Sequence, residues 1–302
     1  MTIWVFCLLS SVFSPAFAAT GVVIQQGGGL YFVTPQGKKV KPQFGDEFYN
    51  GYKVYNTKGR AVLLLFYGDL IDLEGKQKFQ AGEGSVKPRL YLPPPYTALE
   101  DAINVAKMGP VGVKAPLAIH PPVGGIQGIF PIYGDILPSS TLQFEWRGKD
   151  ILGEKPVFII FEKHSKEQKI FSLKAGAKKF SINPAKEKIK EGAEYHWYLG
   201  RIKNGKPVAQ TRVYSFEILS EKNQKKLSRD LEGLSALKLS SREGETFLKS
   251  QIFYHYKLYH NMIDSILPMY QKRPSRSLRR ILYLGFVRLG RYSQAQKYEE
   301  KN

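Results

Sequence analysis

The sequence predicts a multi-domain protein with an all-β N-terminal domain, a β-sandwich middle domain and an α-helical C-terminal hairpin. In the N-terminal part, Gly, Asn and Asp recur about every 8 to 12 residues, which is the turn rhythm of an all-β domain. Between residues 142 and 218, short runs alternate apolar and polar residues, as strands with one buried face do. Beyond residue 246, apolar residues instead recur at helical spacing.

The first element is an export signal. Residues 3–13 are almost wholly apolar, and residues 16–18 read Ala-Phe-Ala, the small-residue pattern of a cleavage site. A helix needs about 20 residues to span a bilayer, so a cleaved signal peptide over residues 1–19 is favoured over a membrane anchor. We therefore expect an exported protein, periplasmic or in the outer cell envelope, with no transmembrane segment after cleavage. The only cysteine, Cys7, lies inside this signal.

The second element is a β-domain over residues 20–87. Residues 62–66 form a continuous apolar run, which is typical of a strand buried on both faces. The pattern of turns and strands from residue 45 to residue 73 resembles the FecR-like domain, a small β-domain of stand-alone exported proteins and of sigma-factor regulators. Its residues are Gly45-Asp46, Gly51, 54–57, 60–66, Gly68-Asp69 and 71–73. The resemblance implies a location in the cell envelope and a role in binding rather than catalysis.

Residues 88–114 are rich in proline and predict a stiff linker. Within it, residues 96–107 could form one helix, because Thr97 and Glu100 have the spacing of a capping box.

The third element is a β-sandwich over residues 115–219. Phe144-x-Trp146 on an early strand and Gly192-x-x-Tyr195-x-Trp197 on a late strand resemble the immunoglobulin-like and fibronectin type III-like sandwiches. Side chains two residues apart on a strand share a face. We therefore expect Phe144, Trp146, Tyr195 and Trp197 to form a structural aromatic core.

The last elements are helical, with a charged helical linker over residues 220–245 and a helical module over residues 246–302. Within the module, Gly290, Tyr292 and Ala295 resemble the turn of a tetratricopeptide repeat, and Pro274 falls near the inter-repeat proline. This degenerate, tetratricopeptide-like tail implies a docking surface for another protein.

Signals for catalysis are weak, and we expect no catalytic residue, no cofactor and no metal. The histidines show no metal-ligand spacing; they are His120, His164, His196, His255 and His260. Asp69, Asp72 and Glu74 look like the paired carboxylates of a glycosidase. However, Asp69 follows Gly68, and an Asp in a turn usually accepts hydrogen bonds from backbone amides.

The charge of the chain favours acidic partners. Its formal net charge is +19, which attracts polyanions. Four arginines lie within eight residues and form a possible patch for a polyanion or an acidic partner; they are Arg273, Arg276, Arg279 and Arg280. The last three share one helix face, which we expect to be exposed. The alternative is a solvated face with no ligand.

These observations predict a non-catalytic, exported binding or scaffold protein of the cell envelope. Its expected partner is an envelope protein or an anionic envelope polymer such as peptidoglycan or lipopolysaccharide, and not nucleic acid. The alternatives are a cell-wall hydrolase built on the carboxylates near Asp69, and a sensor that regulates a membrane signalling partner.

Overall fold

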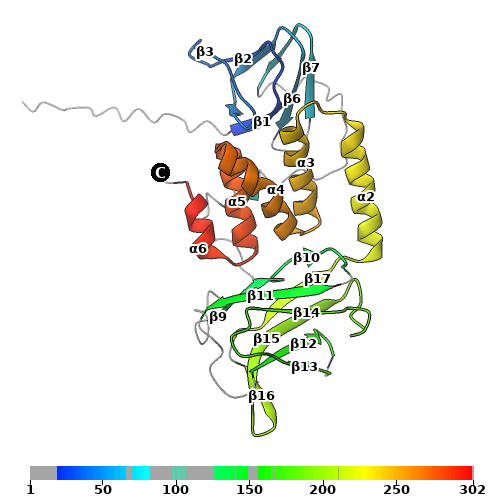
Figure 1. Ribbon diagram of the computed structural model, residues 1–302. Coiled ribbons are helices and arrows are strands. Elements are labelled where there is room, and N and C mark those ends of the chain that lie inside the picture. The colour runs from blue at the N-terminus through cyan, green and yellow to red at the C-terminus, as the bar shows by residue number, and fades with distance from the viewer. Residues whose placement is uncertain are drawn as a thin grey trace, which may run out of the picture.

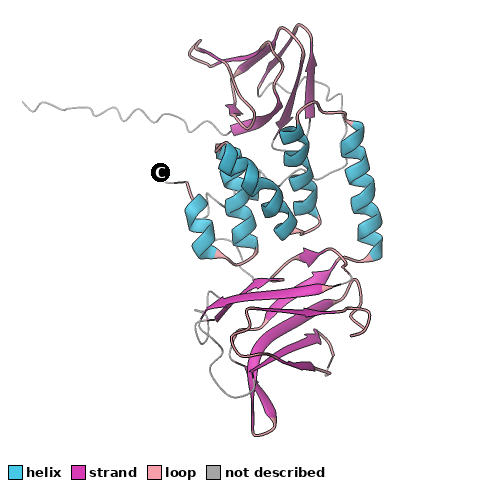
Figure 2. Cartoon of the chain, in the orientation of Figure 1, coloured by secondary structure: helices cyan, strands magenta, loops and turns pink. Residues whose placement is uncertain are grey.

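The computed structural model of the chain describes residues 19–65, 70–81, 98, 101–102, 105, 126–139, 141–148, 156–165, 167–209 and 211–300. It has three layers, in which the C-terminal helices lie between the two β-domains (Figures 1 and 2). Apart from Ala19, the expected signal peptide lies outside the described residues. So does most of the expected linker, although Ala98, Asp101, Ala102 and Val105 are described and are helical.

The N-terminal β-domain consists of two four-stranded sheets, ordered β4-β1-β6-β7 and β3-β2-β5-β8. The strands are β1 (Ala19–Gln25), β2 (Leu30–Val33), β3 (Lys39–Val40), β4 (Glu47–Tyr49), β5 (Lys53–Asn56), β6 (Arg60–Leu65), β7 (Leu70–Glu74) and β8 (Gln77–Gln80).

Strand β6 is buried on both faces, as its unbroken apolar run predicts. Ala61, Leu63 and Leu65 face the core between the two sheets. Val62 and Leu64 face the opposite way, into the core shared with the helices. Both sides of β6 are therefore needed, one to close the β-domain and one to attach it to the helical layer.

The middle domain is a β-sandwich. One sheet has the order β10-β17-β15-β12-β13, with β16 also paired to β15, and the other has the order β14-β11-β9. The strands are β9 (Ile126–Phe130), β10 (Asp135–Ile136), β11 (Leu142–Gly148), β12 (Pro156–Glu162), β13 (Lys169–Ser172), β14 (Lys179–Ile182), β15 (Glu194–Lys203), β16 (Lys206–Ala209) and β17 (Tyr214–Ile218).

The C-terminal region contains five α-helices among the described residues, so the expected hairpin is wrong in extent. They are α2 (Glu221–Ala236), α3 (Arg242–His255), α4 (Tyr259–Lys272), α5 (Arg276–Arg288) and the short α6 (Tyr292–Ala295), and a 3-10 turn, η2 (Gln296–Tyr298), follows. Residues 220–245, the expected helical linker, hold α2 and the start of α3. The side chains of Ser220, Ser241 and Ser275 cap the N-termini of α2, α3 and α5.

The helices hold both β-domains through apolar contacts. On the side of the N-terminal domain, Phe44 packs edge-to-face against Phe247 of α3, with ring centroids 6.2 Å apart. On the side of the sandwich, Phe130 lies 4.6 Å from the ring of His260 in α4. The Asp135 amide also donates a hydrogen bond to the Lys257 carbonyl, at 3.0 Å. The helical region is therefore a central layer rather than a free tail.

Of the helices in the described parts of the chain, none is both long enough and apolar enough to cross a membrane.

Candidate functional site

The four arginines of the expected patch lie at the start of α5 and just before it, but in different surroundings. Arg273 directly follows α4 and is exposed, whereas Arg280 in α5 is only 7% exposed. The expectation that Arg276, Arg279 and Arg280 share an exposed face is therefore wrong for Arg280. Its binding partners are distant in sequence, so the spacing of the arginines alone could not predict its burial.

Arg280 is held between two carboxylates. Its Nη1 lies 2.8 Å from Oε1 of Glu47 on β4, and its Nε lies 2.9 Å from Oε1 of Glu300. The side chain of Glu47 is almost wholly buried, and this burial raises the pKa of its carboxyl group, although Arg280 acts in the opposite direction. The contact therefore fastens the N-terminal β-domain to α5.

Arg276 and Arg279 reach the same acidic residue from the surface. Arg276 Nε lies 2.7 Å from Glu300 Oε1, and Arg279 Nη2 lies 3.8 Å from the same atom. The hydrogen bond from Arg276 is the main reason that the pKa of Glu300 falls to about 2. Much of the positive charge of α5 is thus balanced within the chain, and binding by these residues stays a prediction.

Arg273 instead lines an open pocket at the junction of the β-domain and the helices. The pocket has a volume of about 590 Å³, and its described lining consists of Gln26, Lys41, Gln43 and Arg273, all exposed. Two cations and two amides can together bind a carboxylate or a phosphate, since every one of these side chains can donate hydrogen bonds. This junction pocket is therefore the candidate site at which Arg273 can bind an acidic partner, as the sequence predicts.

Of the three carboxylates of the hydrolase alternative, Asp72 has a structural contact in the described part of the chain. Asp69 lies outside the described residues. Arg60 Nε donates to both oxygens of Asp72 at 3.1 Å, and its Nη1 donates to the Leu237 carbonyl at 3.2 Å. Asp72 therefore orients an arginine that joins β6 to the end of α2. Glu74 is exposed at the end of β7.

The histidines are dispersed. His120 lies outside the described residues, His164 and His255 are exposed, and the ring of His196 pairs with Glu194 at 3.3 Å. His260 is a half-buried residue of α4 beside Phe130 of the sandwich, and burial lowers its pKa to about 3, so the ring is neutral. Among the described residues, no group of three or more His, Cys, Asp or Glu is arranged to hold a metal ion.

The expected aromatic residues all lie in the core of the sandwich. Phe144 and Trp197 are fully buried, while Trp146 and Tyr195 are 3% and 4% exposed. The ring centroids of Phe144 and Trp197 are 5.5 Å apart, and the Trp197 indole donates to the Pro131 carbonyl at 2.7 Å. These side chains pack against one another, which is a structural role.

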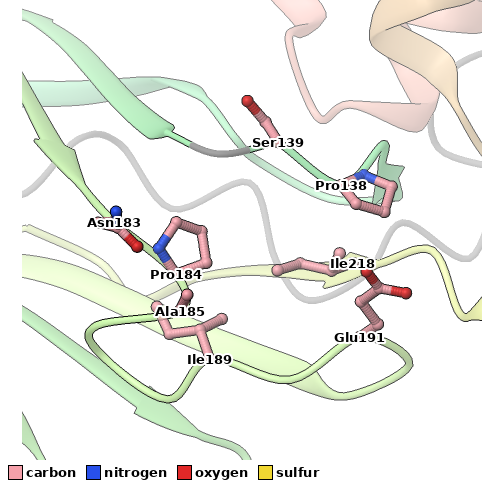
Figure 3. Close-up of a pocket in the computed structure, with 8 residues that line it drawn as sticks. All are labelled: Pro138, Ser139, Asn183, Pro184, Ala185, Ile189, Glu191 and Ile218. Atoms are coloured by element: carbon pink, nitrogen blue, oxygen red, sulfur yellow. The ribbon is translucent and has the colours of Figure 1, made fainter.

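A second pocket lies at one end of the sandwich (Figure 3), with a volume of about 310 Å³. Its lining is mainly apolar and includes Pro138, Pro184 and Ile189. The carboxylate of Glu191, also in the lining, accepts a hydrogen bond from Gln224 at 2.6 Å. The other polar side chains of the lining, Ser139 and Asn183, accept hydrogen bonds from the Thr141 and Lys186 amides. The polar groups of the pocket are thus used within the chain, whereas a small-molecule site needs polar groups that converge on the ligand.

Comparisons with known proteins add little to this geometry. No family model matches the chain, and no curated protein matches its sequence. Among solved structures, it is similar to the FN1-FN3 domains of chicken CNTN1, with a TM-score of 0.23, 7% identity, and 68% of this chain and 58% of that chain covered. It is also similar to a segment of two fibronectin type III domains from chicken tenascin, with a TM-score of 0.19, 10% identity, and 65% and 91% covered. The TM-scores are too low to support an argument, so the sandwich assignment rests on the sheet order itself.

Proposed function

We propose that this chain is a non-catalytic, exported scaffold protein that binds an anionic polymer of the cell envelope. The observation that carries the proposal is the junction pocket, whose described lining holds Lys41 and Arg273 and no carboxylate. The formal net charge of +19 adds a long-range attraction toward such a polymer. A protein partner with an acidic surface is the other expected class.

The contacts of the acidic residues also support the proposed scaffold role. Glu47 and Asp72 are engaged by arginines that join the β-domain to the helices, so these carboxylates stabilise the junction. A general acid or base needs a carboxyl group that can exchange protons with a substrate. A carboxylate bound by a guanidinium is poorly suited to that role, which supports binding over hydrolysis.

We further propose that β1–β8 form a FecR-like domain and that the helices are tetratricopeptide-like. Support for the first is the pair of four-stranded sheets built from short strands. Support for the second is the repeat distance, because α3 begins at Arg242 and α5 begins at Arg276, 34 residues later. A period of 34 residues is typical of tetratricopeptide repeats.

Co-sedimentation with isolated cell-envelope fragments tests the proposed function. The parent protein should sediment with the fragments at about 50 mM salt and be released at about 500 mM, because salt screens exposed charges. Replacing Lys41 and Arg273 together by Ser should weaken binding about 2- to 30-fold, since each of the two exposed ion pairs that are lost contributes about 0.2 to 1 kcal/mol.

The matched control replaces Lys203 and Lys206 by Ser, which removes the same charge from the turn between β15 and β16 at the far end of the sandwich (Figure 1). It should bind like the parent. An absence of parent protein from the pellet at low salt would refute the function. If the two double variants bind equally well, the junction pocket is not the binding site.

A further inference from the structure

The sheet β3-β2-β5-β8 has an outer face with an unusual composition. The strand pairing places Tyr31 opposite Tyr55, and Tyr55 opposite Lys78, in one row. A second row contains Lys39, Val33, Lys53 and Gln80. We call these seven residues the tyrosine–lysine face.

This face points away from both apolar cores. The alternate residues of the same strands, including Phe32, Val54 and Phe79, are buried in the core between the two sheets. The core shared with the helices takes its strand residues from β1, β6 and β7. Lys39, Lys53 and Lys78 are exposed, so their ammonium groups are accessible to a ligand.

The two tyrosines form the centre of the face. Their rings are stacked, with centroids 5.0 Å apart and planes inclined by 11°. Lys39 Nζ lies 3.8 Å from the centroid of the Tyr31 ring, a cation–π contact that places an ammonium group beside the pair. The next residue beyond Tyr55 in the row is another cation, Lys78.

The charge of the face is of one sign. The four strands, all of which the structure describes, place three lysines and no Asp or Glu on the outer face. Only Val33 is aliphatic, so the face offers little apolar surface for insertion into a lipid bilayer. Its chemistry is a strip of ammonium and phenol donors around two aromatic rings.

We infer that the tyrosine–lysine face binds an anionic polysaccharide that carries carboxylate groups. The face of a pyranose ring presents C–H groups that complement the negative face of an aromatic ring, here the side of the Tyr55 ring that is turned away from Tyr31. Carboxylates along the chain would pair with the flanking lysines, and sugar hydroxyls would exchange hydrogen bonds with the phenols. This inference rests on the proposed function, because it identifies a surface and a chemical class for the same polymer binding.

The test measures equilibrium binding of polygalacturonate to the full chain, with dextran as the neutral control and oligothymidylate as the nucleic-acid control. The parent should bind polygalacturonate more tightly than oligothymidylate and should not bind dextran. The variant Lys39→Gln, Lys53→Gln, Lys78→Gln should bind about tenfold more weakly, since three exposed ion pairs are lost. The control Lys188→Gln, Lys203→Gln, Lys206→Gln removes the same charge from the sandwich and should stay within about twofold of the parent.

A second variant separates the rings from the charge. Tyr55→Ser keeps the net charge and should weaken binding about three- to tenfold, whereas Tyr55→Phe keeps the ring and should lose less. Equal weakening by the two triple variants, unchanged binding by Tyr55→Ser, or tighter binding to oligothymidylate would each overturn the inference. If the parent sediments with envelope fragments but does not bind polygalacturonate, this inference fails while the proposed function stands.

Discussion

Asp135 lies where the sandwich meets the loop between α3 and α4. Its carboxyl group is nearly buried, and its neighbours include Glu217 on β17, Lys257 and Tyr259. Burial raises its pKa to about 6, the negative charge of Glu217 adds to this rise, and Lys257 partly offsets it. In the folded protein, ionised Asp135 is therefore less stable than it is in the unfolded chain.

The sign of the resulting pH dependence follows from that shift. Because the folded pKa exceeds the unfolded value of 3.8, Asp135 destabilises the fold above about pH 6 and ceases to do so as the pH falls toward 4. We expect Asp135→Asn to raise the free energy of unfolding at pH 7.5 by roughly 1 to 3 kcal/mol. At pH 4.5 we expect a much smaller gain.

Urea unfolding of parent and variant at both pH values measures this difference, and the comparison cancels the titration of other groups such as His260. Glu167→Gln, which changes an exposed carboxylate of the same domain, is the control and should show no such dependence. A gain that does not shrink at pH 4.5 would contradict the account of Asp135.

At this scale the sequence predicts aromatic residues better than charged ones. Strand alternation is a local property, so it places Phe144 and Trp197 on inward faces without knowledge of the rest of the fold. The surroundings of Arg280 depend on Glu47, 233 residues away in the chain. A helical spacing of arginines contains no information about such a partner, and the expected exposed face is wrong for that reason.

At the scale of elements, β6 connects two cores through the alternation of its side chains. Leu63 and Leu64 are both fully buried, but Leu63 belongs to the core of the β-domain and Leu64 to the core shared with the helices. A substitution at one position should therefore affect a different part of the protein from a substitution at the next.

We expect Leu63→Ala to cost about 2 to 5 kcal/mol and to speed amide hydrogen exchange in β2 and β5, which close the same core. Leu64→Ala should cost a similar amount but should speed exchange mainly in α3. Val40→Ala, at a position that is 37% exposed, is the control and should have little effect. The same exchange pattern in both leucine variants would show that the two cores do not differ in this way.

Strand β16 has a local sequence signal that the prediction did not use, whereas strand β10 has none. Strand β16 follows a turn at Asn204 and Gly205, whose φ angles are 51° and 74°. Asn-Gly between two β-prone runs is a strong signal for a two-residue hairpin, and it could have predicted this strand. The two-residue strand β10 has no such local signal, because its pairing partner β17 is distant in sequence and parallel to it.

For the whole molecule, the sequence predicts the order of the parts along the chain but not how they lie in space. The sequence order is β-domain, sandwich and helices, but in space the helices lie in the middle (Figure 1). Apolar residues at helical spacing predict that each helix packs one face against another element. Among the described residues, those elements include β1, β6 and β7 of the same chain. The identity of a partner cannot be read from the amphipathic pattern alone.

The helical layer holds the two β-domains as one body. The most direct test is the distance between spin labels on Cys residues placed at Lys58 and Lys206, two exposed positions on opposite β-domains, with Cys7 replaced by Ser. We expect one narrow distance distribution for the parent. Arg280→Met should broaden it, because the buried Glu47 would lose its close cation and keep only Tyr49, at 3.3 Å, and Arg276, at 4.0 Å, a loss of up to about 3 to 5 kcal/mol. A broad distribution in the parent itself would contradict the claim, since it would mean that the β-domains move independently.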